Sequence, residues 1–421
     1  MISIPKTAGT NEDKKLITIA FLFCIILIFI RSPRLFIDAR FWAEEGTYYF
    51  KHAYENGILH LFYIYKKCGY YYLYVNIATF IASLVPIVAA PYITTYLAFA
   101  VQVLLIWIIL YAPSCLYKSS YSRILAALFT VVGAAVISEV WLNSVNSQVF
   151  FGLIAVYLLF VDYGKLSKGK RIFLYCVMAM SCLSGVYAVI VAPFFVAKRI
   201  LEQDNKKYNT VIAIIQSACL MVQMVITVVI KFTGSGNSRR SEKTFTGETI
   251  INTIKHQIIR PLLGYDAMKA DNTMVIVVLV LVAVIIVGAV ILSKEKVTVI
   301  TLLGLFVYYA VFTSVTALGI AGGRYAVVPG SVLIALLIKC SEIFYERIKY
   351  NKIKSAAWII VIIPLIFGCI DFQGNKNTYL TTAEHASWEA QIQYLQNKNQ
   401  PIENKEIKIW PDNWTIILDE K

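Results

Sequence analysis

Two adjacent acidic residues, Glu44 and Glu45, belong to the densest cluster of reactive side chains, which runs from Asp38 to Gly46 after the first apolar run. Trp42 stands next to this pair, and a carboxylate that points into an apolar cleft has a raised pKa, which suits a general base. The pair can also contribute to a divalent-cation site, although two ligands alone are weak support for one. The structural alternative is a solvated helix start, where acidic side chains favour the N-terminal dipole.

A second candidate is Arg324, which lies in an apolar stretch away from the basic connections, within Gly322-Gly323-Arg324-Tyr325. An arginine in such a position pairs with another group or binds an anion, and its planar guanidinium matches a phosphate. The alternative is an interfacial side chain that extends its charge to water. We take Arg324 as a candidate phosphate-binding residue.

A third cluster lies between two apolar runs and consists of a carboxylate, amides and an indole: Glu139, Trp141, Asn143, Asn146 and Gln148. Such a set suits recognition of a sugar, because amides and carboxylates bind hydroxyl groups and an aromatic ring stacks on the sugar face. On the residues alone we favour the simpler alternative, a polar turn at a membrane interface.

The amino-acid composition of the chain indicates which kind of structural elements position these residues. The chain has 421 residues, of which 58% are hydrophobic and only 15% are charged. This apolar excess is too large for a soluble core, so lipid must cover much of it. The composition excludes a soluble two-domain enzyme, a disordered chain and a disulfide scaffold. The eight cysteines include no CxxC pair and indicate neither a metal site nor a disulfide framework.

The apolar runs predict an all-α polytopic membrane protein with about 9–11 transmembrane helices and one re-entrant segment. We expect a membrane domain over 1–370, with outer loops at 31–72 and 232–272, and an outer tail at 371–421. The short connections are basic and account for much of the net charge of +14. The positive-inside rule therefore places them, with the N-terminus, in the cytoplasm, and the tail outside.

Counting crossings tests this topology. The connections 162–171 and 198–209 are both basic, so the run 172–197 cannot cross once, and it is too short to cross twice. We expect a re-entrant hairpin that turns near Ser184-Gly185 and lines a substrate cavity. The run 73–113 must cross an odd number of times, although its length suits two spans. Either one of its pieces is re-entrant or 114–123 lies outside, and the sequence leaves both possibilities open.

Three motifs together carry a resemblance: Arg40-Phe41-Trp42-Ala43-Glu44-Glu45-Gly46, Lys67-Cys68-Gly69-Tyr70, and Gly323-Arg324-Tyr325 with Pro329. In layout and motifs the chain resembles the GT-C-type glycosyltransferases, which take sugars from polyprenyl phosphates. It is most similar to the phage-type, serotype-converting O-antigen glucosyltransferases. Many of these relatives have Glu-Asp-Gly where this chain has Glu44-Glu45-Gly46, which leaves open which carboxylate acts.

The resemblance implies a multi-pass glucosyltransferase of the bacterial inner membrane, with its active site facing the periplasm. The donor would be glucose on undecaprenyl phosphate, and the acceptor a hydroxyl of the O-antigen of lipopolysaccharide. A donor synthase, a flippase and membrane lipid would be its partners, and no cofactor is implied beyond a possible divalent cation. Glu44 or Glu45 would be the base. The donor phosphate would be bound by Arg324, Arg40 and Lys67, and the sugars by Trp42, Tyr70, Glu139, Trp141, Asn143, Asn146 and Tyr325.

Two other functions are compatible with the sequence. An O-antigen polymerase or ligase relies on arginines in outer loops, and loop 232–272 contains Arg239, Arg240 and Arg260. A flippase or transporter of lipid-linked sugars would need inverted repeats or charges at mid-membrane, and Glu139 is the only acid within an apolar run. A nucleic-acid binder is excluded because the basic residues do not form one patch.

Overall fold

Long apolar runs form the helices of the structure, a computed structural model that describes residues 11–202, 204–233, 247–317, 322–348, 351–374, 386–398, 400–411 and 413–419. Backbone groups inside lipid must satisfy their own hydrogen bonds, which a helix does. The chain is a polytopic helical membrane protein. Six helices in the described ranges are long and apolar enough to cross a membrane: Ile87–Tyr111, Lys206–Phe232, Asn272–Leu292, Lys296–Val315, Gly323–Arg347 and Lys354–Phe372.

The described helices are, in chain order, α1 (Asn11–Arg31), α2 (Pro33–Ile37), α3 (Lys51–Asn56), α4 (Leu73–Ser83), α5 (Ala90–Tyr111), α6 (Ser120–Val132), α7 (Ser147–Leu159), α8 (Lys168–Leu183), α9 (Val186–Val189), α10 (Ala192–Leu201), α11 (Lys206–Phe232), α12 (Gly247–Ile254), α13 (Arg260–Leu263), α14 (Asn272–Leu292), α15 (Lys296–Ala317), α16 (Val327–Arg347), α17 (Asn351–Ala356), α18 (Ile359–Gly374) and α19 (Trp388–Asn397). In the tail, β1 (Glu406–Ile409) pairs antiparallel with β2 (Trp414–Ile417), with Glu406 opposite Ile417.

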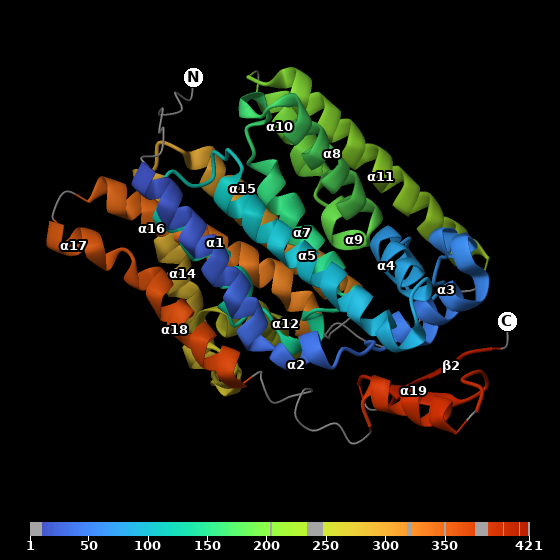
Figure 1. Cartoon of the computed structure of the whole chain (residues 1–421). Coiled ribbons are helices and arrows are strands. Elements are labelled where there is room, and N and C mark those ends of the chain that lie inside the picture. Colours follow the sequence, from blue (N-terminus) through green and yellow to red (C-terminus); the bar gives the residue numbers. More distant parts are fainter. Residues whose placement is uncertain are drawn as a thin grey trace.

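The short basic connections lie together at one end of the helix bundle, which we call the basic face. Hydrogen bonds join Ser120 to Asp13 at 3.2 Å and Asn205 to Asp162 at 2.8 Å, and an ion pair joins Lys118 to Glu346 at 3.3 Å. The opposite end, which we call the loop face, holds residues 38–72, 133–146 and 255–271 and the tail (Figure 1). This separation of basic connections from long loops is the one that the sequence predicts.

The run 73–113 crosses the bundle once, by α5. Near its start, the hydroxyl of Tyr92 donates to the carbonyl of Ile37 on the loop face, and at its end the hydroxyl of Tyr111 donates to Thr18. The shorter α4 starts at the hairpin tip, where Tyr74 donates to Ser184, and the chain just beyond it lies at the loop face, where the Ile87 carbonyl accepts a hydrogen bond from the indole of Trp388 in the tail. Helix α4 therefore does not cross the bundle, and α5 alone accounts for the odd number of crossings.

Helices α8 and α10 form a hairpin that starts and returns at the basic face. The guanidinium of Arg171 lies 3.7 Å from the ring centroid of Tyr208, and Lys198 Nζ donates to the carbonyl of Leu159 at 2.6 Å. The chain turns at Ser184-Gly185, where Gly185 has φ of +107°. This is the geometry expected of the re-entrant segment at 172–197. Ser184 Oγ accepts a hydrogen bond from the amide of Tyr74 at 3.0 Å, so the tip reaches α4.

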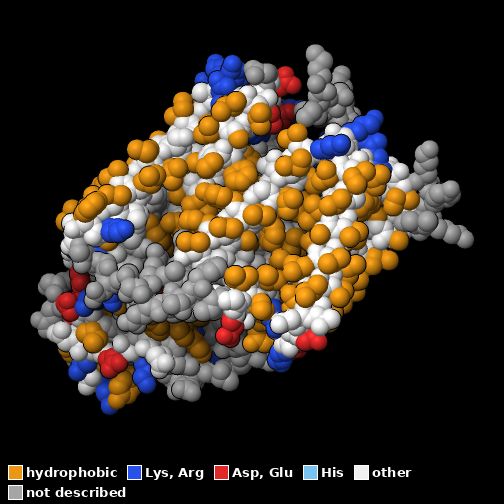
Figure 2. Space-filling view, turned by 180° about the vertical axis from the view of Figure 1, so that it is seen from behind, with side chains coloured by type: hydrophobic (Ala, Val, Ile, Leu, Met, Phe, Trp, Pro, Cys, Tyr) orange, Lys and Arg blue, Asp and Glu red, His pale blue; other side chains and the backbone are white. Residues whose placement is uncertain are grey.

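The surface of the bundle carries a broad apolar belt. Figure 2 shows hydrophobic side chains across the middle of one face, with charged side chains gathered toward its margins. On α14 alone, Ile276, Val280, Val284 and Ile291 are each at least 56% exposed. By contrast, every residue of α7 is buried, so this 13-residue helix is enclosed by protein. Lipid rather than water is the solvent that suits the exposed belt.

The hairpin tip gives a first prediction. A Cβ at residue 185 would meet the side chain of Gln148, and φ of +107° is strained for any other residue. We expect Gly185→Ala to lower the free energy of unfolding by about 1–3 kcal/mol, measured by thermal unfolding in detergent. Gly169→Ala is the matched control, because nothing lies within 4 Å of its added Cβ. Equal stability of the two variants would contradict the tight turn.

Candidate functional site

The carboxylate of Glu45 is fully buried and joins two distant segments of the loop face. Its Oε1 accepts hydrogen bonds from the amide of Ser144 at 2.7 Å and from the Ser144 hydroxyl at 2.5 Å. Its Oε2 accepts from the amide of Trp42 at 3.1 Å. Burial raises the pKa of Glu45, while the hydrogen bonds from Ser144, Trp42 and Thr94 lower it. Oε1 thus fastens the first outer segment to residues 138–146, while Oε2 is engaged within the outer segment itself.

The tail shapes the backbone around this pair of acids. Ala43 has a positive φ of +42°, and its amide donates to the carbonyl of Trp410. The amide of Trp410 donates in return to the carbonyl of Phe41 at 3.2 Å. At Gly46 an added Cβ would lie 2.7 Å from Cδ1 of Ile409 and equally close to Ile416, so only glycine fits there. The tail therefore packs directly on the carboxylate loop.

Glu44 points elsewhere and is only half-buried. Its nearest ionisable neighbours include the Cys68 thiol, whose pKa is raised to about 11 by burial and by the Glu44 carboxylate and is lowered by the Arg324 guanidinium. Cys68 therefore lies within electrostatic reach of both charges. Next to it, the hydroxyl of Tyr70 accepts a hydrogen bond from Gln148 Nε2 at 3.0 Å. Glu44 is thus within electrostatic range of Cys68, beside the contact between Tyr70 and Gln148.

Arg324 interacts electrostatically with Cys68 and Tyr70 of this group. Its side chain is 28% exposed and forms an ion pair of 3.5 Å with Glu139. Its Nη1 donates to Oδ1 of Asn146 at 3.4 Å, and its guanidinium carbon lies 5.4 Å from the ring centroid of Tyr325. These contacts are long for charge-assisted hydrogen bonds, which leaves the guanidinium capacity for a stronger anion. The sequence clusters around Arg324 and Glu139 are therefore one site.

The amides of the third cluster mainly shape the turn that carries Glu139. Nδ2 of Asn143 and Nδ2 of Asn146 each donate to the Glu139 carbonyl at 2.9 Å. Trp141 is buried, and the guanidinium of Arg31 lies 4.3 Å from its ring centroid. Trp141 is therefore a buried packing residue with no exposed face for a sugar, whereas the side chain of Asn146 contacts Arg324.

The first outer segment also contains Arg40, Trp42 and Lys67. These residues contact the tail or aromatic residues of the same segment. The Arg40 guanidinium carbon is 4.5 Å from the ring centroid of Trp410, in the contact with the tail. Trp42 bridges to Trp410 and packs on Tyr72 and its neighbours. Lys67 is exposed, with its Nζ 6.0 Å from the ring centroid of Tyr48.

Tyr187 is a site residue that the motifs do not reveal. It lies at the hairpin tip, two residues after Gly185, and it interacts electrostatically with Arg324, Glu139 and Tyr325. Its side chain is 4% exposed, yet its hydroxyl has no hydrogen-bond partner among the described residues. A buried hydroxyl of this kind is a candidate donor to a ligand. The only feature of the sequence that pointed to Tyr187 is the substrate cavity predicted at the re-entrant turn.

Within the described part of the chain, no group of three or more His, Cys, Asp or Glu side chains is arranged to hold a metal ion. Comparison of the sequence with protein-family models and with curated proteins gives no match. Any functional assignment therefore rests on the geometry of the site and on the motifs themselves.

The burial of Glu45 gives a prediction about pH. Because its pKa in the folded protein is raised above the ordinary value of 4.5, the protonated form stabilises the fold, and this contribution is lost as pH rises above that value. We expect the thermal stability of the wild type to fall as pH rises above 4.5, relative to Glu45→Gln, which cannot ionise. Parallel stability curves for the two proteins would contradict a raised pKa.

Proposed function

We propose that the chain is a membrane glycosyltransferase of the GT-C type that moves a hexose, most simply glucose, from undecaprenyl phosphate to a hydroxyl of O-antigen or lipopolysaccharide. The observation that supports this best is the ion pair of Arg324 with Glu139 on the loop face, together with the electrostatic interaction of Cys68 with both Arg324 and Glu44. Transfer from a sugar phosphate needs a base and an anion-binding group in one site.

Glu44 is the better candidate for the base, because both oxygens of Glu45 are already hydrogen-bonded in the buried loop contact. In the proposed step Glu44 takes the proton of the acceptor hydroxyl. The acceptor oxygen forms a bond to the anomeric carbon while the bond from that carbon to the phosphate oxygen breaks. The electron pair leaves with the polyprenyl phosphate, through an oxocarbenium-like state.

Arg324 would stabilise the negative charge of the leaving phosphate, with the Tyr187 hydroxyl as a neutral donor beside it. Neither Arg324 contact, to Glu139 or to Asn146, is short enough to compete with a bidentate phosphate. Lys67 is exposed and could approach the donor from the loop, whereas Arg40 would act through the docked tail. Tyr70, Trp42 and Tyr325 supply aromatic faces for the sugars.

The alternative of an O-antigen polymerase or ligase gains no support from Arg260. Its Nε donates to the carbonyl of Ala134 at 3.1 Å, and the side chain is buried beside Tyr265. Arg239 and Arg240 lie outside the described residues. The contact at Arg260 holds the segment before Glu139 and leaves this arginine little freedom to bind a substrate.

The proposed base can be tested by sugar transfer in lipid nanodiscs, with glucosyl undecaprenyl phosphate as donor and O-antigen as acceptor. We expect Glu44→Gln to lower kcat by about 100-fold or more without changing thermal stability. The matched control is Asp266→Asn, an exposed carboxylate on the same face, which should keep full activity. Full activity in Glu44→Gln would overturn the mechanism, and products longer by whole repeat units would indicate a polymerase.

We also propose that the protein lies in a bacterial inner membrane with its basic face in the cytoplasm and its site facing the periplasm. The expectation is tested with single cysteines introduced into an active cysteine-free background in intact spheroplasts. A membrane-impermeant maleimide should label a cysteine at Lys269 or Lys405 and leave one at Lys168 or Lys207 unlabelled until the membrane is opened. The reverse pattern would invert the orientation.

A further inference from the structure

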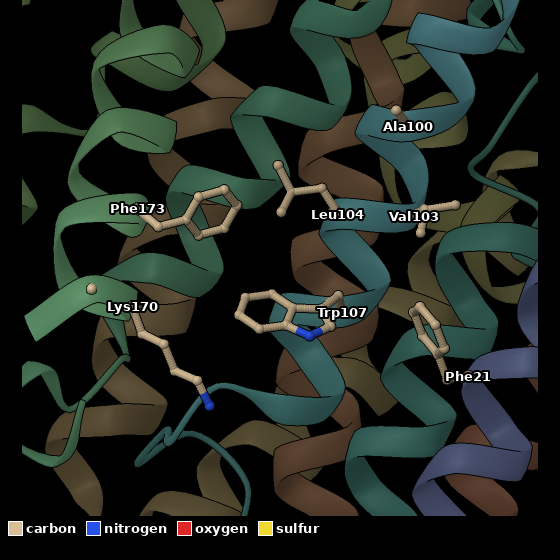
Figure 3. Close-up of a pocket in the computed structure, with 8 residues that line it drawn as sticks. Phe21, Ala100, Val103, Leu104, Trp107, Lys170 and Phe173 are labelled. Carbon is tan, nitrogen blue, oxygen red and sulfur yellow. The ribbon is translucent and has the colours of Figure 1, made fainter. Parts of the chain in front are cut away.

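An open apolar groove of about 500 Å³ lies on the lipid-facing surface between α1, α5 and α8. Phe21, Leu104, Trp107 and Phe173 supply most of its wall, and Gly169 and Ala100 leave it room. Figure 3 shows the ring of Phe173 and the indole of Trp107 extending toward each other into the space between α8 and α5. Their ring centroids are 6.1 Å apart in an edge-to-face arrangement.

One end of this groove lies at the basic face. Trp107 is in the last turns of α5 and Lys170 in the first turn of α8, where tryptophan and lysine are typical of the membrane interface. The groove then runs seven residues along α5 to Ala100, which is about 10 Å of helix. A channel that starts at the interface and descends into the apolar belt matches the path of an acyl chain.

Lys170 gives the mouth of the groove a positive charge. The side chain is exposed and forms no ion pair with any acidic residue that the structure describes. Lys168 is also exposed in the same turn, and Lys14 and Lys15 are exposed at the start of α1, which borders the groove. Basic side chains at this level attract anionic headgroups.

We propose that the groove binds an anionic phospholipid of the leaflet at the basic face, with one acyl chain against Trp107 and Phe173 and its phosphate at Lys170. The proposed sugar donor is a different lipid at a different place. Thr94, which interacts with Glu45, is 13 residues before Trp107 on α5, or about 20 Å along the helix. The phospholipid site is therefore independent of the transfer reaction.

The test uses the full chain in phosphatidylcholine bilayers that contain either brominated phosphatidylglycerol or brominated phosphatidylcholine. Bromine quenches a tryptophan that it touches, and the signal of Trp107 is obtained by subtracting that of Trp107→Phe. We expect the anionic lipid to bind at Trp107 roughly fivefold more tightly than the zwitterionic one. Lys170→Gln should abolish this preference, and the matched control Lys207→Gln, an exposed lysine outside the groove, should keep it.

Two results would overturn the proposal. The first is equal quenching by the two brominated lipids in the wild type, which would make the groove an ordinary lipid-facing furrow. The second is an unchanged preference in Ala100→Phe, because this exposed position can accept a ring that fills the groove. Thermal unfolding of each variant is measured alongside, so that loss of the preference is assigned to the groove only in a folded protein.

Discussion

The hydrogen bonds of the buried Glu45 carboxylate hold the loop face together. A carboxylate removed from water is costly unless donors replace its hydration, and here Ser144 and Trp42 do so. Ser144 lies 99 residues from Glu45 in the sequence, so the contact ties the first outer segment to the turn before α7. Separating these segments would leave Glu45 Oε1 without the two hydrogen bonds from Ser144. Glu44 and Asn146 are neighbours of Glu45 and Ser144 in the sequence, so this tie also fixes their positions.

The tail stabilises the same loop from outside. Trp388 packs edge-to-face on Phe41, with ring centroids 5.2 Å apart, and Thr47 donates to the carbonyl of Thr415 at 2.7 Å. A short polar tail with few apolar residues could not bury a core alone. Its hairpin and helix instead complete a small core with the first outer segment, in which Ile409 and Ile416 meet Gly46. The tail is therefore part of the scaffold of the candidate site, although it is the most distant segment in the sequence.

Much of the fold could be predicted from local patterns in the sequence. Apolar runs and basic connections predict the helices, the two faces and the turn at Ser184-Gly185. The length of an apolar run and the charge of a connection can both be read from short stretches of sequence. Which of Glu44 and Glu45 is buried could not be predicted, because the two adjacent residues share every local pattern and the burial of Glu45 depends on Ser144, 99 residues away. The burial of Trp141 under Arg31 and the approach of Tyr187 to Arg324 also depend on contacts between distant segments.

Helix α5 connects the two ends of the molecule and limits how they can influence each other. Near the loop face its Thr94 interacts with Glu45, and near the basic face its Trp107 lines the apolar groove. Coupling between such sites requires an element with two discrete arrangements. Between these residues the chain contains neither glycine nor proline, and Ala98, Val101 and Leu105 are buried along one side. A regular helix packed in this way has a single arrangement, so we do not expect it to switch between two. A lipid in the groove would therefore leave the arrangement of the loop-face residues unchanged, which agrees with a phospholipid site that is independent of the transfer reaction.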